Sequence, residues 1–386
     1  MTYYVLTSVF ILLFGTLNYY IGLLGWHLLS MNMSFLNQNT YWIFFSIIVI
    51  CILIGITANK FLPYFLRSSF YVLGYYWLAA LSYFIIAIII FNVIVFSNKI
   101  IHFSKNLISN NLVFTNLFIV CVVIVTIILL IYGTFNGKKL RIKTYNVNVS
   151  KDESILEELN IVMISDIHIS NIDDERQNKI INVINNLNPD IVFIVGDILD
   201  DIMTFAEHKV IDDFHKINSK YGVYACLGNH DYLNGDLSYV IDKLNESKIN
   251  VLRDSVVEIA HSFYIIGRED KSYEMISKQK RIKLSNLMKG INSKLPIIML
   301  DHQPINIPEA EDAGIDLQLS GHTHKGQFFP FNFITNKLFK VHYGYLKTGR
   351  LQVVVSCGAG TWGPPIRIGS TSEVVNIIVK FQKQIF

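Results

Sequence analysis

The first 151 residues of this chain contain no aspartate or glutamate, whereas the rest of its 386 residues contain 30. Four apolar runs without a charged side chain lie in this acid-free part, at residues 4–26, 41–57, 70–96 and 112–132. Each run is close to the roughly 20 residues that a helix needs to cross the hydrocarbon core of a bilayer. We therefore expect residues 1–137 to form an integral membrane region of about four transmembrane helices, surrounded by bilayer lipid.

The basic residues around these runs predict the orientation of the chain in the cell membrane. With four spans, the N-terminus and the residues after the last span lie on the same side. That side holds Lys60, Arg67, Lys138, Lys139, Arg141 and Lys143, and the opposite side holds Lys99 and Lys105. Cytoplasmic loops carry the excess of lysine and arginine, so we expect the C-terminal part to be cytoplasmic.

Charge also limits what the C-terminal part can bind. From Asp152 onward, 30 acidic residues oppose 24 basic ones, a net charge of about −6. Nucleic-acid binding needs a basic stripe that neutralises phosphates, so we expect no nucleic-acid partner.

Residues 158–386 have the hydrophobic pattern of a domain that combines strands and helices. Short apolar runs at 161–165, 191–195 and 223–227 are typical of buried strands. Residues 175–187 have helical spacing, and later runs at 263–266, 297–300, 317–319, 351–356 and 374–379 alternate more loosely. The pattern predicts an α/β domain with α+β character, joined to the membrane region by a juxtamembrane linker at 138–157.

Five short motifs follow predicted strands, and each supplies carboxylate, amide or imidazole groups. They are Asp166-Ile-His168, Gly196-Asp197-Ile-Leu-Asp200, Gly228-Asn229-His230-Asp231, Asp301-His302 and Gly321-His322-Thr-His324. Ligands gather at the carboxyl ends of strands in α/β sheets, so we expect these side chains to converge. Oxygen and imidazole donors without a thiolate suit Mn²⁺, Fe or Zn²⁺. The motifs therefore predict a site for two divalent metal ions, in which Asp197 can bridge both.

The order of the motifs, DxH, GDxxD, GNHD, a single histidine and GHxH, resembles the calcineurin-like metallophosphoesterase family over residues 158–386. The stretches Ile-Ser-Asp-Ile-His, Leu-Asp-His-Gln-Pro and Gly-Thr-Trp-Gly-Pro-Pro-Ile-Arg are similar to its membrane-attached bacterial branch. The resemblance implies a four-layer sandwich in which two mixed β-sheets are flanked by helices.

The resemblance also implies a role for each motif residue. One metal ion would take Asp166, His168, Asp197 and His324, and the second would take Asp197, Asn229, His302 and His322. His230 would protonate the leaving oxygen, and Asp231 would orient its imidazole. Asp200 and Asp301 would accept hydrogen bonds from groups bound to the metals.

Three further residues have open roles. Arg268 and Asp270 follow a predicted strand and could meet the substrate or the groups around the metals, but a surface ion pair fits equally well. Arg367 could reach the rim of the site, although a structural loop is the simpler interpretation.

Together these expectations describe a membrane-anchored, metal-dependent phosphoric ester hydrolase. The resemblance favours a phosphodiester or pyrophosphate bond over a monoester, so the chain is a predicted phosphodiesterase. Anchoring confines the enzyme to the bilayer, which favours a lipid-linked or nucleotide-linked phosphoester as substrate. A phosphomonoesterase or protein phosphatase is one alternative. A non-catalytic metal-binding membrane sensor is another, and it is disfavoured because His230 and every predicted ligand are present.

Overall fold

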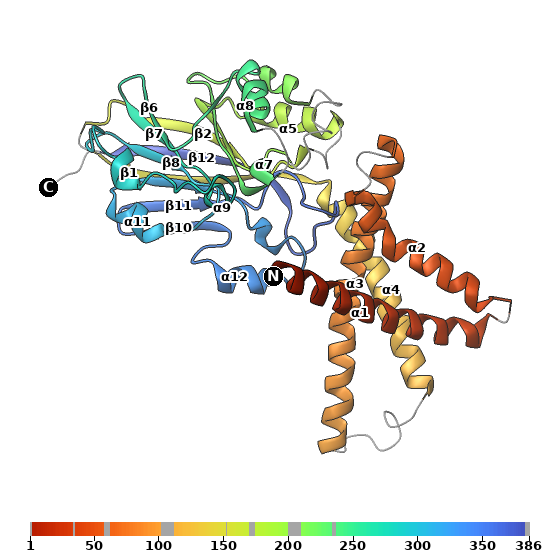
Figure 1. Ribbon diagram of the computed structural model, residues 1–386. Coiled ribbons are helices and arrows are strands. Elements are labelled where there is room, and N and C mark those ends of the chain that lie inside the picture. Colours follow the sequence, from red (N-terminus) through yellow and green to blue (C-terminus); the bar gives the residue numbers. More distant parts are fainter. Residues whose placement is uncertain are drawn as a thin grey trace. The chain divides into compact units, whose positions relative to one another are not determined.

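The computed structural model describes residues 2–33, 35–57, 62–101, 112–151, 153–169, 174–199, 210–233 and 237–382. The chain forms two compact units, Met1–Gly133 and Thr134–Phe386 (Figure 1). The boundary between them falls in the last turns of the fourth helix, which ends at Gly137.

The first unit consists of apolar helices. They are α1 (Thr2–Asn32), α2 (Gln38–Thr57), α3 (Tyr64–Ile101) and α4 (Leu112–Gly137). Among the described residues, four stretches are long and apolar enough to span a membrane, at Ser8–Met31, Gln38–Gly55, Ser68–Ile101 and Leu112–Gly137. They overlap the four runs seen in the sequence, so the expected region of four helices that could span a membrane is confirmed.

Helices α2 and α3 approach closely because a glycine faces the neighbouring backbone at two points. A β-carbon on Gly55 would lie 2.7 Å from the backbone nitrogen of Tyr71, and one on Gly74 would lie 2.4 Å from that of Ile52. Small residues permit such contacts between membrane helices, whose association depends on packing because lipid is as apolar as their side chains. The pair α2–α3 therefore depends on these two glycines.

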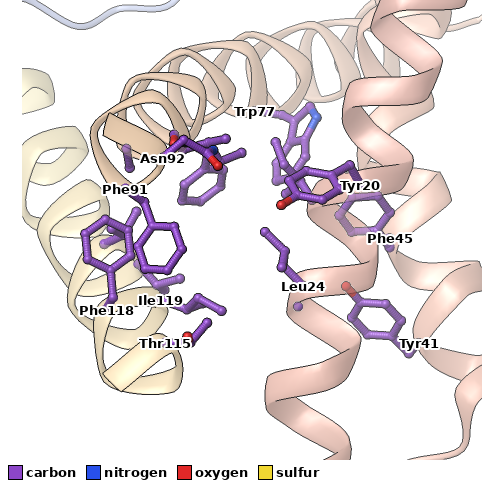
Figure 2. Close-up of a pocket in the computed structure, with 17 residues that line it drawn as sticks. Tyr20, Leu24, Tyr41, Phe45, Trp77, Phe91, Asn92, Thr115, Phe118 and Ile119 are labelled. Atoms are coloured by element: carbon purple, nitrogen blue, oxygen red, sulfur yellow. The ribbon is translucent and has the colours of Figure 1, made fainter. Parts of the chain in front are cut away.

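A cavity of about 270 Å³ lies among the four helices of the first unit (Figure 2). Leu24 of α1, Phe45 of α2, Phe91 of α3 and Phe118 of α4 are among the residues that line it. Two polar groups in the lining are bonded within the unit. The hydroxyl of Tyr41 donates to the carbonyl of Gly22 at 2.7 Å, and Nε1 of Trp77 donates to Oδ1 of Asn18 at 2.9 Å. The surface that faces the cavity is consequently mainly hydrocarbon.

The second unit contains two six-stranded mixed sheets. The order in the first sheet is β1 (Leu140–Ser150), β12 (Ser372–Gln382), β2 (Glu158–Ile164), β3 (Ile191–Val195), β4 (Val223–Cys226) and β5 (Ile249–Val251). The order in the second is β10 (Gly344–Thr348), β11 (Leu351–Val355), β9 (Leu317–Ser320), β8 (Ile297–Leu300), β7 (Phe263–Gly267) and β6 (Ser255–Ile259). Strands β2 to β5 are mutually parallel, as are β11, β9, β8 and β7.

Helices cover the outer face of each sheet, and the two inner faces pack against each other (Figure 1). The central layer joins Ile161 and Phe193 of the first sheet to Ile298 and Leu319 of the second. Helices α5 (Asp174–Asn186) and α8 (Leu237–Glu246) and the 3-10 helix η2 (Val210–Lys216) cover the first sheet. The short helices α10 (Leu284–Leu287) and α11 (Ile307–Asp312) cover the second. The predicted four-layer sandwich of two mixed sheets flanked by helices is confirmed.

Strand β1 lies inside the segment 138–157, for which the sequence predicts a linker. It pairs in parallel with β12 over eleven residues, and Lys138 and Lys139 alone separate it from α4. Of the eleven residues of β1, Val147 and Val149 are the buried ones. Its apolar and polar residues alternate from Leu140 to Lys143, but Thr144 shifts the phase before the alternation resumes at Tyr145, so the pattern is too short on either side to predict one strand.

Replacing Gly74 by leucine should destabilise the full chain, because the new side chain would collide with the α2 backbone at Ile52. Overpacking of this kind costs about 1–3 kcal/mol. Gly15→Leu is the matched control, since nothing lies within 4 Å of a β-carbon built on Gly15. We expect the thermal unfolding midpoint in detergent to fall for Gly74→Leu alone. Equal midpoints for the two variants would show that α2 and α3 do not approach as described.

Candidate metal centre

Five strands of the second unit end at the predicted metal ligands. Each is followed, within four residues, by a side chain that can donate oxygen or nitrogen. Parallel neighbouring strands present their carboxyl ends at one edge, which is where ligand groups gather in such sheets. Asp166 and His168 follow β2, Asp197 follows β3, Asn229 follows β4, His302 follows β8, and His322 and His324 follow β9. Asp200, from the second motif, lies outside the described residues.

The side chains form two compact groups of potential ligands. In the first group, Nε2 of His324 lies 3.1 Å from Nε2 of His168 and 3.3 Å from Oδ1 of Asp166. The second group comprises Asp197, His302 and His322, and within each group the donor atoms lie within 4.8 Å of one another. These groups match the two ligand sets that the family resemblance implies, except that Asn229 is missing from the second group and Asp197 belongs to one group only.

Asp197 lies between the two groups. Its Oδ2 is 3.1 Å from Nε2 of His302 in its own group and 4.0 Å from Nε2 of His168 in the other. Asn229 adjoins the second group, because its Oδ1 lies 2.8 Å from Nδ1 of His322. The structure thus brings the predicted ligands of both sets to one place.

The backbone at these ligands adopts a conformation that most residues avoid. Asp166, His168, Asp197, His322 and His324 all have positive φ, between 48° and 72°. Left-handed backbone is uncommon outside glycine, and where it persists it clusters at functional sites.

Two glycines let the loops of the site approach each other. A β-carbon on Gly196 would lie 2.4 Å from Nδ1 of His302, and one on Gly228 would lie 2.2 Å from Oδ1 of Asp197. A larger residue at either position would push a ligand away. The glycines that begin the second and third motifs are therefore sterically required.

Burial and neighbouring charges set the ionisation of the donors. Burial, with a contribution from His302, lowers the pKa of His322 to about 4. Burial also holds the pKa of His324 well below its ordinary value, and the charges of His168 and Arg367 add to the effect. Burial opposes ionisation of Asp197, but the adjacent His302 and His168 lower the pKa of its carboxyl below the usual range. Burial would also lower the pKa of His302, but the carboxylates of Asp197 and Asp166 raise it well above its ordinary value. Metal binds neutral imidazoles and ionised carboxylates, so a cation at this site has to displace the proton of His302.

The chemistry of these residues fits divalent metal ions. Asp166, His168 and His302 are 0% exposed and Asp197 is 1% exposed. Nδ1 of His302 is fixed by the carbonyl of Val195 at 2.8 Å, which leaves Nε2 facing Oδ2 of Asp197 at 3.1 Å. Burying several charged and polar groups together is costly, and a cation that they share reduces that cost. Oxygen and imidazole donors suit Mn²⁺, Fe or Zn²⁺.

His230, the predicted proton donor, lies at the border of the two groups. Its ring centroid is 5.1 Å from that of His168 and 5.9 Å from that of Trp362. Its backbone N–H donates to Oδ1 of Asp197 at 2.9 Å. The loop that carries His230 is therefore fixed to the central carboxylate.

Asp231, expected to orient His230, is a buried acceptor for backbone groups. Oδ1 accepts the N–H groups of Ile198 and Leu199 at 3.0 Å each, and Oδ2 accepts that of Gly228 at 2.8 Å. Burial and the charge of Asp197 raise the pKa of Asp231 to about 7 despite these donors. Asp231 thus joins the loops after β3 and β4, and its action on the His230 ring stays a prediction.

Asp301, Arg268 and Asp270 lie in a buried polar network, at 4%, 5% and 0% exposed. Asp301 accepts a hydrogen bond from Nη2 of Arg281 at 2.8 Å, and Asp270 accepts from Nε2 of Gln303 at 3.0 Å. Their burial excludes the surface ion pair that the sequence allowed for Arg268 and Asp270. Through Gln303 the network supports the loop of His302, the residue before it.

Arg367, whose role the sequence left open, lies in the wall of the site. It is 0% exposed, its Nη2 donates to the carbonyl of Gly360 at 2.6 Å, and the same atom lies 3.3 Å from Nδ1 of His324. Its own carbonyl accepts from Nδ2 of Asn136 at 3.0 Å, which also donates to the carbonyl of Ser370 at 2.8 Å. The sequence signal, an arginine in a loop rich in glycine and proline, does not reveal that its guanidinium is buried behind a predicted ligand.

Comparison with known proteins identifies relatives of this chain. The family described as calcineurin-like phosphoesterase matches residues 159–326. A metallophosphoesterase of Campylobacter jejuni is 32% identical over 270 residues, which cover 66% of this chain and 68% of the relative. A metallophosphoesterase of Aquifex aeolicus is 30% identical over 66% of this chain and 97% of its own length. A transmembrane protein with a metallophosphoesterase domain from Danio rerio is 29% identical over 66% of this chain and 61% of its own length.

The matched region contains all the predicted ligands from Asp166 to His324, and the family typically binds divalent metals there. The apolar helices of the first unit and the transmembrane relative support membrane association. The resemblance predicted from the motifs is therefore confirmed, and the chain belongs to the calcineurin-like metallophosphoesterase family of phosphoester hydrolases.

Proposed function

We propose that the chain is a membrane-anchored phosphoesterase that uses two divalent metal ions to hydrolyse a phosphodiester or pyrophosphate bond. The main support is the position of Asp197, whose Oδ2 is 3.1 Å from His302 in one donor group and 4.0 Å from His168 in the other. One carboxylate has two oxygens and can bridge two cations. Two cations about 3.5–4 Å apart clamp the attacking and leaving oxygens of a phosphoryl displacement.

Each residue has a task set by its place. When bound, the divalent ions would lower the pKa of water and neutralise charge on the phosphoryl oxygens. Asp197 keeps the two donor groups adjacent and, through Oδ1, fixes the N–H of His230. His230, at the border of the groups, gives its proton to the leaving oxygen. Asp231 fixes the loops on which Asp197 and His230 stand.

The membrane region favours a substrate that also resides at the bilayer. Confinement of enzyme and substrate to one surface raises their effective concentration. The class proposed is therefore a lipid-linked phosphodiester or pyrophosphate, including lipids that carry a nucleotide. A phosphomonoester is the competing substrate class.

We also propose that the second unit is cytoplasmic. With four spans, its side of the membrane carries Arg67, Lys138, Lys139, Arg141 and Lys143 among the described residues, and the opposite side carries Lys99. Lysine and arginine concentrate on the cytoplasmic side.

Asp197→Asn should lose bound metal and activity, whereas His230→Ala should keep its metal and lose activity. The asparagine retains an oxygen for the N–H of His230 but lacks the charge that binds cations. Loss of a general acid lowers turnover by about 10²–10⁴-fold. Metal content by elemental mass spectrometry, read beside the hydrolysis rate, separates the two variants. His261→Ala is the control, because the His261 side chain is 94% exposed. Equal metal loss in both site variants would contradict the assigned roles.

The protein loaded with Mn²⁺ should hydrolyse bis(p-nitrophenyl) phosphate faster than p-nitrophenyl phosphate. The diester has the bond class proposed here, and the monoester has that of the alternative. Release of p-nitrophenol at equal substrate concentration measures both rates. Faster turnover of the monoester would favour a phosphomonoesterase. Failure of the metal-loaded protein to hydrolyse either compound would favour a metal-binding sensor.

A protease added outside intact cells should leave the second unit undigested. A tag placed after Phe386 should survive external digestion and disappear once the cells are made permeable. The measurement is an immunoblot of the tag under both conditions. Digestion in intact cells would place the second unit on the outer side.

A further inference from the structure

An apolar rim borders the candidate metal centre. It consists of Phe329, Phe333, Ile334, Leu338 and Trp362, which are 50%, 63%, 54%, 71% and 49% exposed. Three of the five lie on α12 (Asn332–Leu338), a helix in which no residue is buried. Adjoining large apolar side chains left in water mark a surface that binds something.

The rim is continuous with the metal centre on two sides. The ring of Phe339, the residue after α12, lies 5.9 Å from the ring of the predicted ligand His322. The ring of Trp362 lies 5.9 Å from that of His230. Gln327, two residues before Phe329, holds Trp362 beside that part of the rim, because its Nε2 donates to the carbonyl of Trp362 at 2.7 Å and its Oε1 accepts the N–H of Trp362 at 2.9 Å. Whatever covers the rim therefore lies next to the reacting phosphoryl group.

The charge around the rim selects an anionic partner. Residues 317–372 contain no aspartate or glutamate and six lysines or arginines, although the C-terminal part as a whole is acidic. Lys337 and Lys340, at the end of α12, are exposed. Apolar side chains flanked by lysine are typical of elements that lie in a membrane interface, with the apolar groups about 5–10 Å deep and the lysines among the phosphates.

The chain itself keeps this unit at a bilayer. Helix α4 is long and apolar enough to span a membrane and ends at Gly137, and β1 begins at Leu140. With two residues between a span and the first strand, the second unit cannot move far from lipid. A bilayer is therefore an apolar, anionic surface that lies within reach of this unit.

We propose that the apolar rim docks on the surface of the lipid bilayer and places the metal centre at the depth of the lipid phosphates. The proposal rests on the function proposed above and makes its substrate class a phosphoester lipid taken directly from the bilayer. A small soluble diester reaches the metal centre from water and does not need the rim. A substitution in the rim should therefore lower hydrolysis of the lipid substrate and leave hydrolysis of the soluble diester nearly unchanged.

The first test measures docking without catalysis. The full chain with Cys121→Ser, which removes an exposed thiol, carries a spin label at Leu338→Cys or at Ile155→Cys. Ile155 is the matched control, since it is 70% exposed and Leu338 is 71% exposed. In nanodiscs of phosphatidylcholine and phosphatidylglycerol, the label at position 338 should collide with oxygen more than with a water-soluble nickel chelate. The label at position 155 should show the reverse, and an aqueous signal at both positions would overturn the proposal.

The second test compares two substrates. Leu338→Glu and Ile155→Glu are each placed in proteoliposomes that contain a p-nitrophenyl phosphodiester of diacylglycerol. Leu338→Glu should lower hydrolysis of the lipid by at least roughly tenfold, because a charged group replaces an apolar one that docking would bury in the bilayer. Hydrolysis of soluble bis(p-nitrophenyl) phosphate should change by less than about twofold, and Ile155→Glu should alter neither rate. Equal loss on both substrates, or no loss on the lipid, would refute docking. If the unmodified protein hydrolyses neither compound, the proposed function fails while the spin-label result still decides the docking.

Discussion

The buried carboxylate of Asp197 is the interaction on which the metal centre depends. Its Oδ2 faces His302 and His168, and its Oδ1 fixes the N–H of His230. The main-chain carbonyl of the same residue accepts the N–H groups of Ile167 and His168 at 2.9 and 3.2 Å. One residue thus connects the loops after β2, β3 and β4 and the histidine after β8. Burial alone would favour a neutral carboxyl there, and the surrounding imidazoles are what keep it ionised.

The ligands could be predicted from the sequence because each one follows an apolar run that becomes a strand. This pattern involves only residues that are neighbours in the sequence, so the sequence alone reveals it. Contacts made by tertiary packing are not visible in the same way. The three backbone donors of Asp231 come from two different loops, and Arg367 is buried although its neighbours in the chain give no sign of it. Strand β1 was not predicted because most of its side chains are exposed and its apolar alternation changes phase, so that its pairing with the distant β12 is what makes it a strand.

The two longest parts of the chain without acidic residues are both suited to contact with lipid. Residues 1–151 include the four apolar spans, and residues 317–372 include the apolar rim. A carboxylate is costly in hydrocarbon and is repelled by anionic headgroups, so both segments are suited to lipid in the same way. The acidic residues of the second unit are concentrated elsewhere, apart from those at the metal centre and its supporting network. If the rim docks as proposed, composition divides the enzyme by its distance from lipid as well as by its domains.

Asn136 belongs to α4, yet its amide satisfies the carbonyls of Arg367 and Ser370 in the wall of the metal centre. The last turn of α4 therefore stabilises the wall of the metal centre. A soluble version that starts after Gly137 would leave two carbonyls without their donor behind the His324 side of the site. Detaching the enzyme cleanly requires a cut before Thr134, within the helix, where the second compact unit begins.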